Sequence, residues 1–212
     1  IRIILIFMNE RTINSKKDLE EGIRFLSYHD PALSSVIDRE KISLTKRSIG
    51  FSALLKTIVS QQLSTSAASK IWQRIVESNL DIQENIHQVK DEKLLSLGLS
   101  RQKCSYARAL AEAKIDYISL GKLDSNLVIK RLIEIKGIGQ WSAQIYCMFS
   151  LARSNIFPSG DLALQEAIRV LLKLDSRPNI KEVDEISERW APWKTIAALV
   201  LWSFYSKQRK KE

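Results

Sequence analysis

The stretch LIEIKGIGQWSAQIYCMFSLARSNIFPSGDLAL, residues 132–164, decides the fold. One apolar helical pattern ends in the Gly-Ile-Gly of residues 137–139, and a second apolar helix is expected to begin at about Gln140. Glycine adopts backbone angles closed to other residues and lets another backbone approach closely. The free N–H groups at the start of the next helix form a natural anion site. The stretch therefore predicts two helices joined by a tight turn. Such a turn binds phosphate groups and does not recognise a base sequence.

The isoleucine inside this turn, Ile138, is expected to enter the core and anchor the turn. A Gly-x-Gly pattern alone is more often an ordinary helix C-terminus followed by another helix. The lone Asp161, about twenty residues later and directly before a third apolar helix, makes the pattern more specific. Taken without further context, that aspartate is best explained as the N-cap of the third helix.

The composition favours a globular protein with a polyanionic partner. The chain has 212 residues, 45% hydrophobic and 27% charged, enough for one large domain or two small lobes. Only 7 glycines and 4 prolines argue against a loop-rich all-β protein. The net charge of +9 and the pI near 9.6 favour nucleic acid as the partner, and a solvated basic surface is the alternative.

The metal-binding residue types are sparse and scattered. Cys104 and Cys147 both lie in apolar helical patterns, which predicts buried thiols and not a disulfide. His29 and His87 stand alone, and no group of ligands has the spacing of a zinc or iron–sulfur site. We therefore expect no cofactor.

The periodicity predicts helices nearly throughout and no strand. We expect a disordered or non-native start over 1–15, whose first seven residues could be upstream or cloning sequence, and a basic tail over 208–212. One helical lobe is predicted over 51–150, and a terminal-helix lobe combines 16–50 with 151–207. The start has an apolar run too short for a membrane span and shows no targeting signal, so we expect a cytoplasmic protein.

Four segments together carry a family resemblance. The quoted stretch resembles the hairpin and catalytic core of the helix–hairpin–helix DNA glycosylases, and three more segments match that family in the expected order. These segments are TIVSQQLSTSAASKIW (57–72), GLSRQKCSYARALAEA (98–113) and ERWAPWKTIAALVLW (188–202). The resemblance covers roughly residues 20–207 and is nearest to the short form of the bacterial DNA-3-methyladenine glycosylase II type.

The resemblance implies an all-α, two-lobed fold with the active site in the cleft between the lobes. It gives Asp161 the catalytic role. Excision of a flipped base leaves positive charge on the sugar, which a carboxylate stabilises while it orients or deprotonates water. Lyase-competent branches carry a lysine at position 141, but this chain has Trp141, and Lys136 lies on the other side of the turn. The resemblance therefore implies a monofunctional hydrolase of alkylated purines that leaves the strand uncut.

The resemblance also places aromatic residues around the damaged base. Trp141 and Trp202 match pocket positions, where cation–π contact would attract a cationic alkylated ring. The alternative for each is a core tryptophan, and Trp72, Trp190 and Trp193 are expected to be packing residues. Ile145 and Leu162 stand where some relatives have tyrosine, so the pocket is expected to be less aromatic.

DNA contacts are implied at two turns. Gln62, with Gln61 beside it, matches the wedge that fills the gap left by the flipped base, and an ordinary polar turn is the alternative. The predicted contacts to the DNA backbone are Gly137, Ile138, Gly139, Gln140, Ser142, Lys136, Arg101 and Lys103. No metal is certain, although in relatives hairpin carbonyls, here those of Ile133, Ile135 and Ile138, hold a monovalent cation.

The predicted partner is double-stranded DNA containing damaged bases. We expect no membrane association, no obligate protein partner, and a monomer at the bacterial nucleoid. Two other functions remain open at this stage. One is a non-catalytic lesion-binding protein, against which the retained Asp161 argues. The other is a glycosylase for deaminated or oxidised bases, against which Trp141 and the missing cysteine cluster argue.

Overall fold

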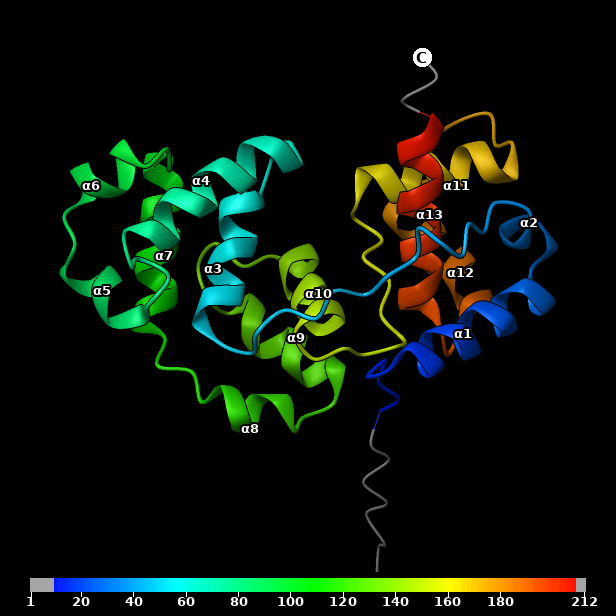
Figure 1. Ribbon diagram of the computed structural model, residues 1–212, viewed down its shortest axis with the longest axis horizontal. Helices are drawn as coiled ribbons and strands as arrows, with labels where there is room; N and C mark the ends of the chain where they lie inside the picture. The colour runs from blue at the N-terminus through cyan, green and yellow to red at the C-terminus, as the bar shows by residue number, and fades with distance from the viewer. Residues whose placement is uncertain (1–9, 209–212) are drawn as a thin grey trace, which may run out of the picture. The chain divides into compact units, whose positions relative to one another are not determined.

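The computed structural model describes residues 10–208 (Figure 1). Within these residues the chain forms thirteen α-helices and one 3-10 helix, and the only β-type pairing described is an isolated bridge between Thr12 and Arg153. The prediction of an all-α fold is therefore confirmed. Backbone contacts divide the chain into two compact units, each considered separately below.

The inner unit comprises Thr45–Leu151 and Pro158–Asp161, and the terminal unit comprises the remainder. The predicted lobe boundaries at residues 50 and 150 lie close to this division. One prediction is corrected, because Asp161 groups with the inner unit although the sequence assigned it to the terminal lobe. Residues 158–161 belong to the inner unit, whereas Phe157 before them and Leu162 after them belong to the terminal unit. This places Asp161 in the same unit as the glycine turn.

The inner unit is built around one apolar helix, α3 (Phe51–Ser60). Seven of its ten residues are buried, and it packs against α4, α7 and α10. An apolar helix enclosed on several sides is the expected centre of a helical core. The other helices of the unit are α4 (Thr65–Glu77), α5 (Gln83–Gln88), α6 (Asp91–Ser96), α7 (Arg101–Glu112), α8 (Tyr117–Gly121), α9 (Ser125–Ile133) and α10 (Gln140–Phe149).

Local capping residues set the helix starts in the inner unit. The Ser64 side chain accepts the N–H of Ala67 at the start of α4, and Ser100 does the same for Lys103 in α7. Gly98, at φ +106°, occupies the turn before α7, where a side chain would be strained. These caps fix where α4 and α7 begin, and so fix the positions of the residues predicted to face DNA.

The terminal unit is organised on its last helix, α13 (Lys194–Gln208), which packs against α11, α1, α2 and the 3-10 helix. Gly22 allows the close approach of α1, because a Cβ there would lie 2.3 Å from the Ile196 side chain. Trp190 and Trp193 are buried, as predicted for packing residues. The remaining elements of the unit are α1 (Lys16–His29), α2 (Pro31–Ser34), α11 (Leu162–Leu172), α12 (Ile180–Ser187) and η1 (Glu188–Trp190).

The described part of the predicted disordered start is ordered. Ile13 is buried and its N–H donates to the carbonyl of Ala152, while Thr12 forms the bridge with Arg153. The prediction of disorder is therefore wrong for residues 10–15, because these contacts lie 140 residues away in sequence and leave no local signal. Residues 1–9, and with them the question of residues 1–7, lie outside the described residues, as do 209–212 of the predicted tail.

Candidate active site and DNA interface

The turn between α9 and α10 requires glycine at its first position. Gly137 has φ +93°, and a Cβ there would lie 2.1 Å from the ring of Tyr106 on α7. Both the backbone angle and the close contact exclude a side chain. Ile138 is 4% exposed and its N–H donates to the carbonyl of Ile135, which confirms that it anchors the turn in the core.

The N-terminus of α10 is open. Its N-cap is Gly139, which supplies no capping side chain, and a Cβ on Gly139 would meet nothing within 4 Å. The first bond of the helix runs from the Ala143 N–H to the Gly139 carbonyl, so the N–H groups of the three residues before Ala143 precede the helical ladder. Such a terminus carries partial positive charge and accommodates an anion. Lys136, which is exposed, adds a cation beside it.

The Gln61 side chain is bonded to the hairpin within the protein. Its amide Nε2 donates to the Gly137 carbonyl at 2.8 Å and to the Ser142 hydroxyl at 3.0 Å. These two bonds hold the end of α3 against the hairpin. Ser142 is itself only 3% exposed, so its hydroxyl is placed to brace the hairpin. The wedge role of Gln61 and the DNA-backbone contact of Ser142 stay predictions.

Gln62 lies at the tip of the turn between α3 and α4. It is exposed, with φ +54°, and Leu63 beside it is 39% exposed. A non-glycine residue at positive φ is uncommon and marks a constrained turn. The wedge role of Gln62 stays a prediction, with the side chain at an exposed tip as the role requires.

The Lys103 ammonium binds backbone carbonyls of the protein itself, and its predicted phosphate contact stays a prediction. It donates to the carbonyls of Val59 and Gln61 at 2.7 and 2.8 Å and so caps the C-terminus of α3. Partial burial lowers the pKa of this ammonium. Arg101, two residues earlier on α7, is exposed, and its phosphate contact stays a prediction.

The carboxylate of Asp161 is held by the indole of Trp141. The Trp141 Nε1–H donates to Asp161 Oδ2 at 2.9 Å. The Asp161 N–H in turn donates to the Pro158 carbonyl at 2.8 Å, which closes the turn that carries the acid. Since Trp141 is the second residue of α10, the bond brings the acid next to the open helix terminus. The two residues that the sequence placed at the centre of the chemistry therefore meet within one unit.

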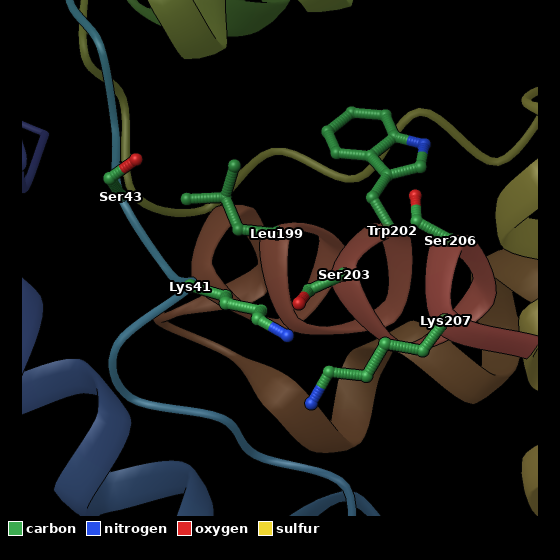
Figure 2. A pocket seen from close by; sticks show the side chains of 7 residues that line it. All are labelled: Lys41, Ser43, Leu199, Trp202, Ser203, Ser206 and Lys207. Atoms are coloured by element: carbon green, nitrogen blue, oxygen red, sulfur yellow. The ribbon is translucent and has the colours of Figure 1, made fainter. Parts of the chain in front are cut away.

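The other predicted pocket residue, Trp202, lies in the terminal unit and lines a cavity of about 330 Å³ (Figure 2). Its indole and the side chains of Lys41 and Lys207 extend to different sides of α13 in that view. Both lysines pair with Asp38, at 3.6 and 2.5 Å, and the Lys207 bond is the larger cause of a lowered Asp38 pKa. The base-contacting role of Trp202 stays a prediction.

The two departures from the aromatic pattern lie in contrasting surroundings. Ile145 is 4% exposed and belongs to the inner core, whereas Leu162, directly after Asp161, is 62% exposed. An exposed leucine beside the acid offers apolar surface without the ring that some relatives have there.

Across residues 10–208, no three His, Cys, Asp or Glu side chains are grouped to hold a metal ion. In the same part of the chain, no helix combines the length and apolar character needed to cross a bilayer. Both cysteines are buried thiols, as predicted. The monovalent cation at the carbonyls of Ile133, Ile135 and Ile138 stays a prediction, with the Ile135 oxygen already accepting one backbone bond.

An all-helical chain with an uncapped helix N-terminus after a glycine turn, and a carboxylate bonded to that helix, fits the helix–hairpin–helix class of DNA repair proteins. Residues 55–192 match the family model described as HhH-GPD superfamily base excision DNA repair protein, and the chain belongs to this family.

Among its relatives, DNA-3-methyladenine glycosylase 1 of Schizosaccharomyces pombe is 32% identical over 161 residues, covering 72% of this chain and 71% of the relative. The Bacillus subtilis protein YfjP is 31% identical over 165 residues, covering 72% of this chain and 58% of YfjP. The chain therefore spans little more than half of that relative. The solved Schizosaccharomyces pombe 3-methyladenine DNA glycosylase Mag1, in complex with abasic DNA, superposes with a TM-score of 0.78 at 28% identity, covering 86% and 95% of the two chains.

Proposed function

We propose that this protein is a monofunctional DNA glycosylase that removes alkylated purines of the 3-methyladenine and 7-methylguanine type. The observation that carries the proposal is the hydrogen bond from Trp141 to Asp161 beside the open terminus of α10. It sets a carboxylate and an aromatic side chain next to a phosphate-type anion site. The relatives named as 3-methyladenine glycosylases, and the neighbour solved with abasic DNA, support the substrate class.

In this proposal Asp161 acts on the deoxyribose. The bond from C1′ to the purine nitrogen breaks, and its electron pair leaves with the base, neutralising the positive charge of an alkylated ring. Negative charge on Asp161 stabilises the cationic sugar, and the carboxylate accepts a proton from the water whose oxygen bonds to C1′. Because the leaving base is already cationic, the reaction needs no strong general acid.

Trp141 determines the reaction type in this proposal. A lyase needs an amine at this position to attack C1′ and form a Schiff base. An indole has no such nucleophile, and its N–H is already bonded to Asp161. The expected product is a free base and an abasic strand that breaks only when alkali is added.

The test is base release from methylated duplex DNA, separated by chromatography, for wild type and Asp161→Asn. We expect the wild type to release 3-methyladenine and the variant to lose at least about 100-fold in single-turnover rate. Asp175→Asn is the matched control, because it removes the same charge from an exposed aspartate in the terminal unit. Lesion binding without release by wild type would favour a non-catalytic protein. Equal release by Asp161→Asn would show that another group is catalytic.

The proposal includes the partner and the location. One duplex needs one active site, so the protein is expected to act as a monomer on damaged DNA at the bacterial nucleoid, without an obligate protein partner. Light scattering of the purified protein, alone and with one equivalent of duplex, measures the stoichiometry directly.

A further inference from the structure

A second cavity, which lies in the inner unit, is lined by positively charged side chains near the N-terminal end of α3. It has a volume of about 300 Å³ and its lining includes Lys46, Arg47, Lys56, Trp72 and Asp81. Three cations thus face one carboxylate. None of these residues belongs to the hairpin or the acid site described above.

Two of these cations have hydrogen-bonding capacity that the described part of the chain leaves unused. The Arg47 guanidinium stacks over the Phe149 ring at 4.8 Å, and its only described acceptor is the Thr57 hydroxyl at a long 3.5 Å. Lys56 lies over the Trp72 ring at 5.6 Å and donates to no described residue. A guanidinium has five N–H donors and an ammonium three, so most of them are left for solvent or a ligand.

In the protein without a ligand, the proximity of the Arg47 and Lys56 charges is energetically unfavourable. Arg47 and Lys56 are both partly buried, and burial lowers the pKa of each. The like charge of Arg47 lowers the pKa of Lys56 further. Two half-buried cations side by side are unfavourable unless an anion lies between them. The only acid lining the cavity, Asp81, is instead within 3.5 Å of the Ser52 hydroxyl.

The backbone at the start of α3 adds N–H hydrogen-bond donors, which also carry partial positive charge. α3 begins here after Gly50, which has φ +131° and supplies no capping side chain. The first bond of the helix runs from the Leu54 N–H to the Gly50 carbonyl at 3.4 Å, so the preceding N–H groups lie outside the helical ladder. The Arg47 N–H is fixed to the Phe149 carbonyl at 2.8 Å, which holds the guanidinium near this terminus. A helix N-terminus joined by an arginine and a lysine matches the chemistry of a phosphate site.

We propose that this cavity binds a backbone phosphate of the DNA strand, as a second anchor beside the hairpin. The inference rests on the proposed function, which supplies the polyanion. The cavity lies near the start of α3, and Gln61, directly after the other end of α3, holds the hairpin. The ten residues of α3 span about 15 Å, or about four base-pair steps of duplex. The Lys56 ammonium lies over the Trp72 ring, which forms an apolar wall of the cavity.

The test is the salt dependence of binding to an undamaged duplex, which needs no catalysis. Lys56→Met keeps the stem on Trp72 and removes the charge. The slope of log K against log salt, measured between about 50 and 200 mM, is expected to fall by about 0.9, the contribution of one phosphate. The free variant is expected to be as stable as wild type or more stable, because the like-charge pair is gone. Arg47→Gln should give the same change in slope.

Lys93→Met is the matched control. Lys93 is exposed on α6, which lies apart from α9 and α10 in Figure 1. Its removal should leave the slope unchanged. An unchanged slope for Lys56→Met would overturn the second anchor while leaving base release untouched. Conversely, absence of base release with a reduced slope would overturn the proposed enzyme and keep the DNA anchor.

A footprint of the Lys56 amine identifies the source of the phosphate. The protein is treated with an acylating reagent, alone, with the same duplex, and with millimolar inorganic phosphate, and modification is read by mass spectrometry. Protection by duplex but not by phosphate supports the anchor. Equal protection by free phosphate would show a small-anion site instead, and protection by neither would overturn the proposal.

Discussion

The side chain at position 141 is set to do more than stack against a base. Trp141 donates its indole N–H to Asp161, so its ring and its nitrogen have separable consequences. Stacking requires only the ring, whereas orientation of the acid requires the N–H. Trp141 is therefore a positioning residue for the carboxylate in addition to its predicted place in the base pocket.

Substitution at this residue separates the two roles. Trp141→Phe keeps an aromatic face and removes the donor. We expect its single-turnover rate to fall about 10- to 100-fold, the equivalent of one hydrogen bond to a charged group, with little change in substrate affinity. Trp141→Leu removes the ring as well and should also weaken binding of the damaged duplex. A phenylalanine variant as fast as wild type would show that the hydrogen bond has no part in the reaction.

At the scale of elements, the two glycines of the hairpin have different roles. Gly137 is needed by the fold, since its φ is +93° and Tyr106 occupies the space of a Cβ. Gly139 has φ −91° and open space around it, so the fold tolerates a side chain there. Its value lies in leaving the α10 terminus accessible.

Alanine at each glycine tests this division. Gly137→Ala is expected to lower the free energy of unfolding by about 2–4 kcal/mol, from the strained backbone and the clash. Gly139→Ala should change stability by less than about 0.5 kcal/mol but weaken duplex binding, because its methyl stands where a phosphate approaches. Urea unfolding and titration with duplex measure the two effects. Equal loss of stability in both variants would contradict the assignment.

The elements also show what could be predicted from sequence. Helix caps such as Ser64 and Ser100 depend only on neighbours within a few residues, and the buried position predicted for Ile138 is confirmed. The brace from Gln61 to Gly137 joins residues 76 apart, and Lys103 caps a helix 42 residues away. No local pattern records such pairs. The short helices α5 and α8 were not predicted, because five or six residues are too few to show a period.

At the scale of the whole molecule, charge and burial act in opposite directions. A net charge of +9 favours a polyanionic partner but opposes compaction, and part of that charge lies on the partly buried side chains of Arg47, Lys56 and Lys103. The Lys103 ammonium is hydrogen-bonded to backbone carbonyls, whereas Arg47 and Lys56 line the cavity that we propose binds a phosphate. Sequence counts such as net charge cannot distinguish these uses, because the distinction depends on which backbone atoms lie nearby.

Global stability should reveal a second effect of burial, at alkaline pH. The hydroxyls of Tyr117 and Tyr146 are buried in the inner unit. Burial raises the pKa of Tyr146 to about 12 and also raises that of Tyr117. The unfolded chain therefore loses these protons from about pH 10, while the folded protein retains them. Stability should fall as pH rises from 10 toward 12, since the folded state then binds more protons.

Tyr146→Phe removes one of these groups without emptying its space. The variant should lose less stability than wild type between pH 10 and about 12, by an amount on the order of 2 kcal/mol at the upper end. At neutral pH its stability should stay within about 1 kcal/mol of that of wild type, the net contribution of one neutral hydrogen bond such as that with the Gly50 backbone. Tyr28→Phe is the control, since Tyr28 is 85% exposed. Unfolding by urea at several pH values measures all three proteins, and identical pH profiles for Tyr146→Phe and wild type would contradict the buried, protonated Tyr146.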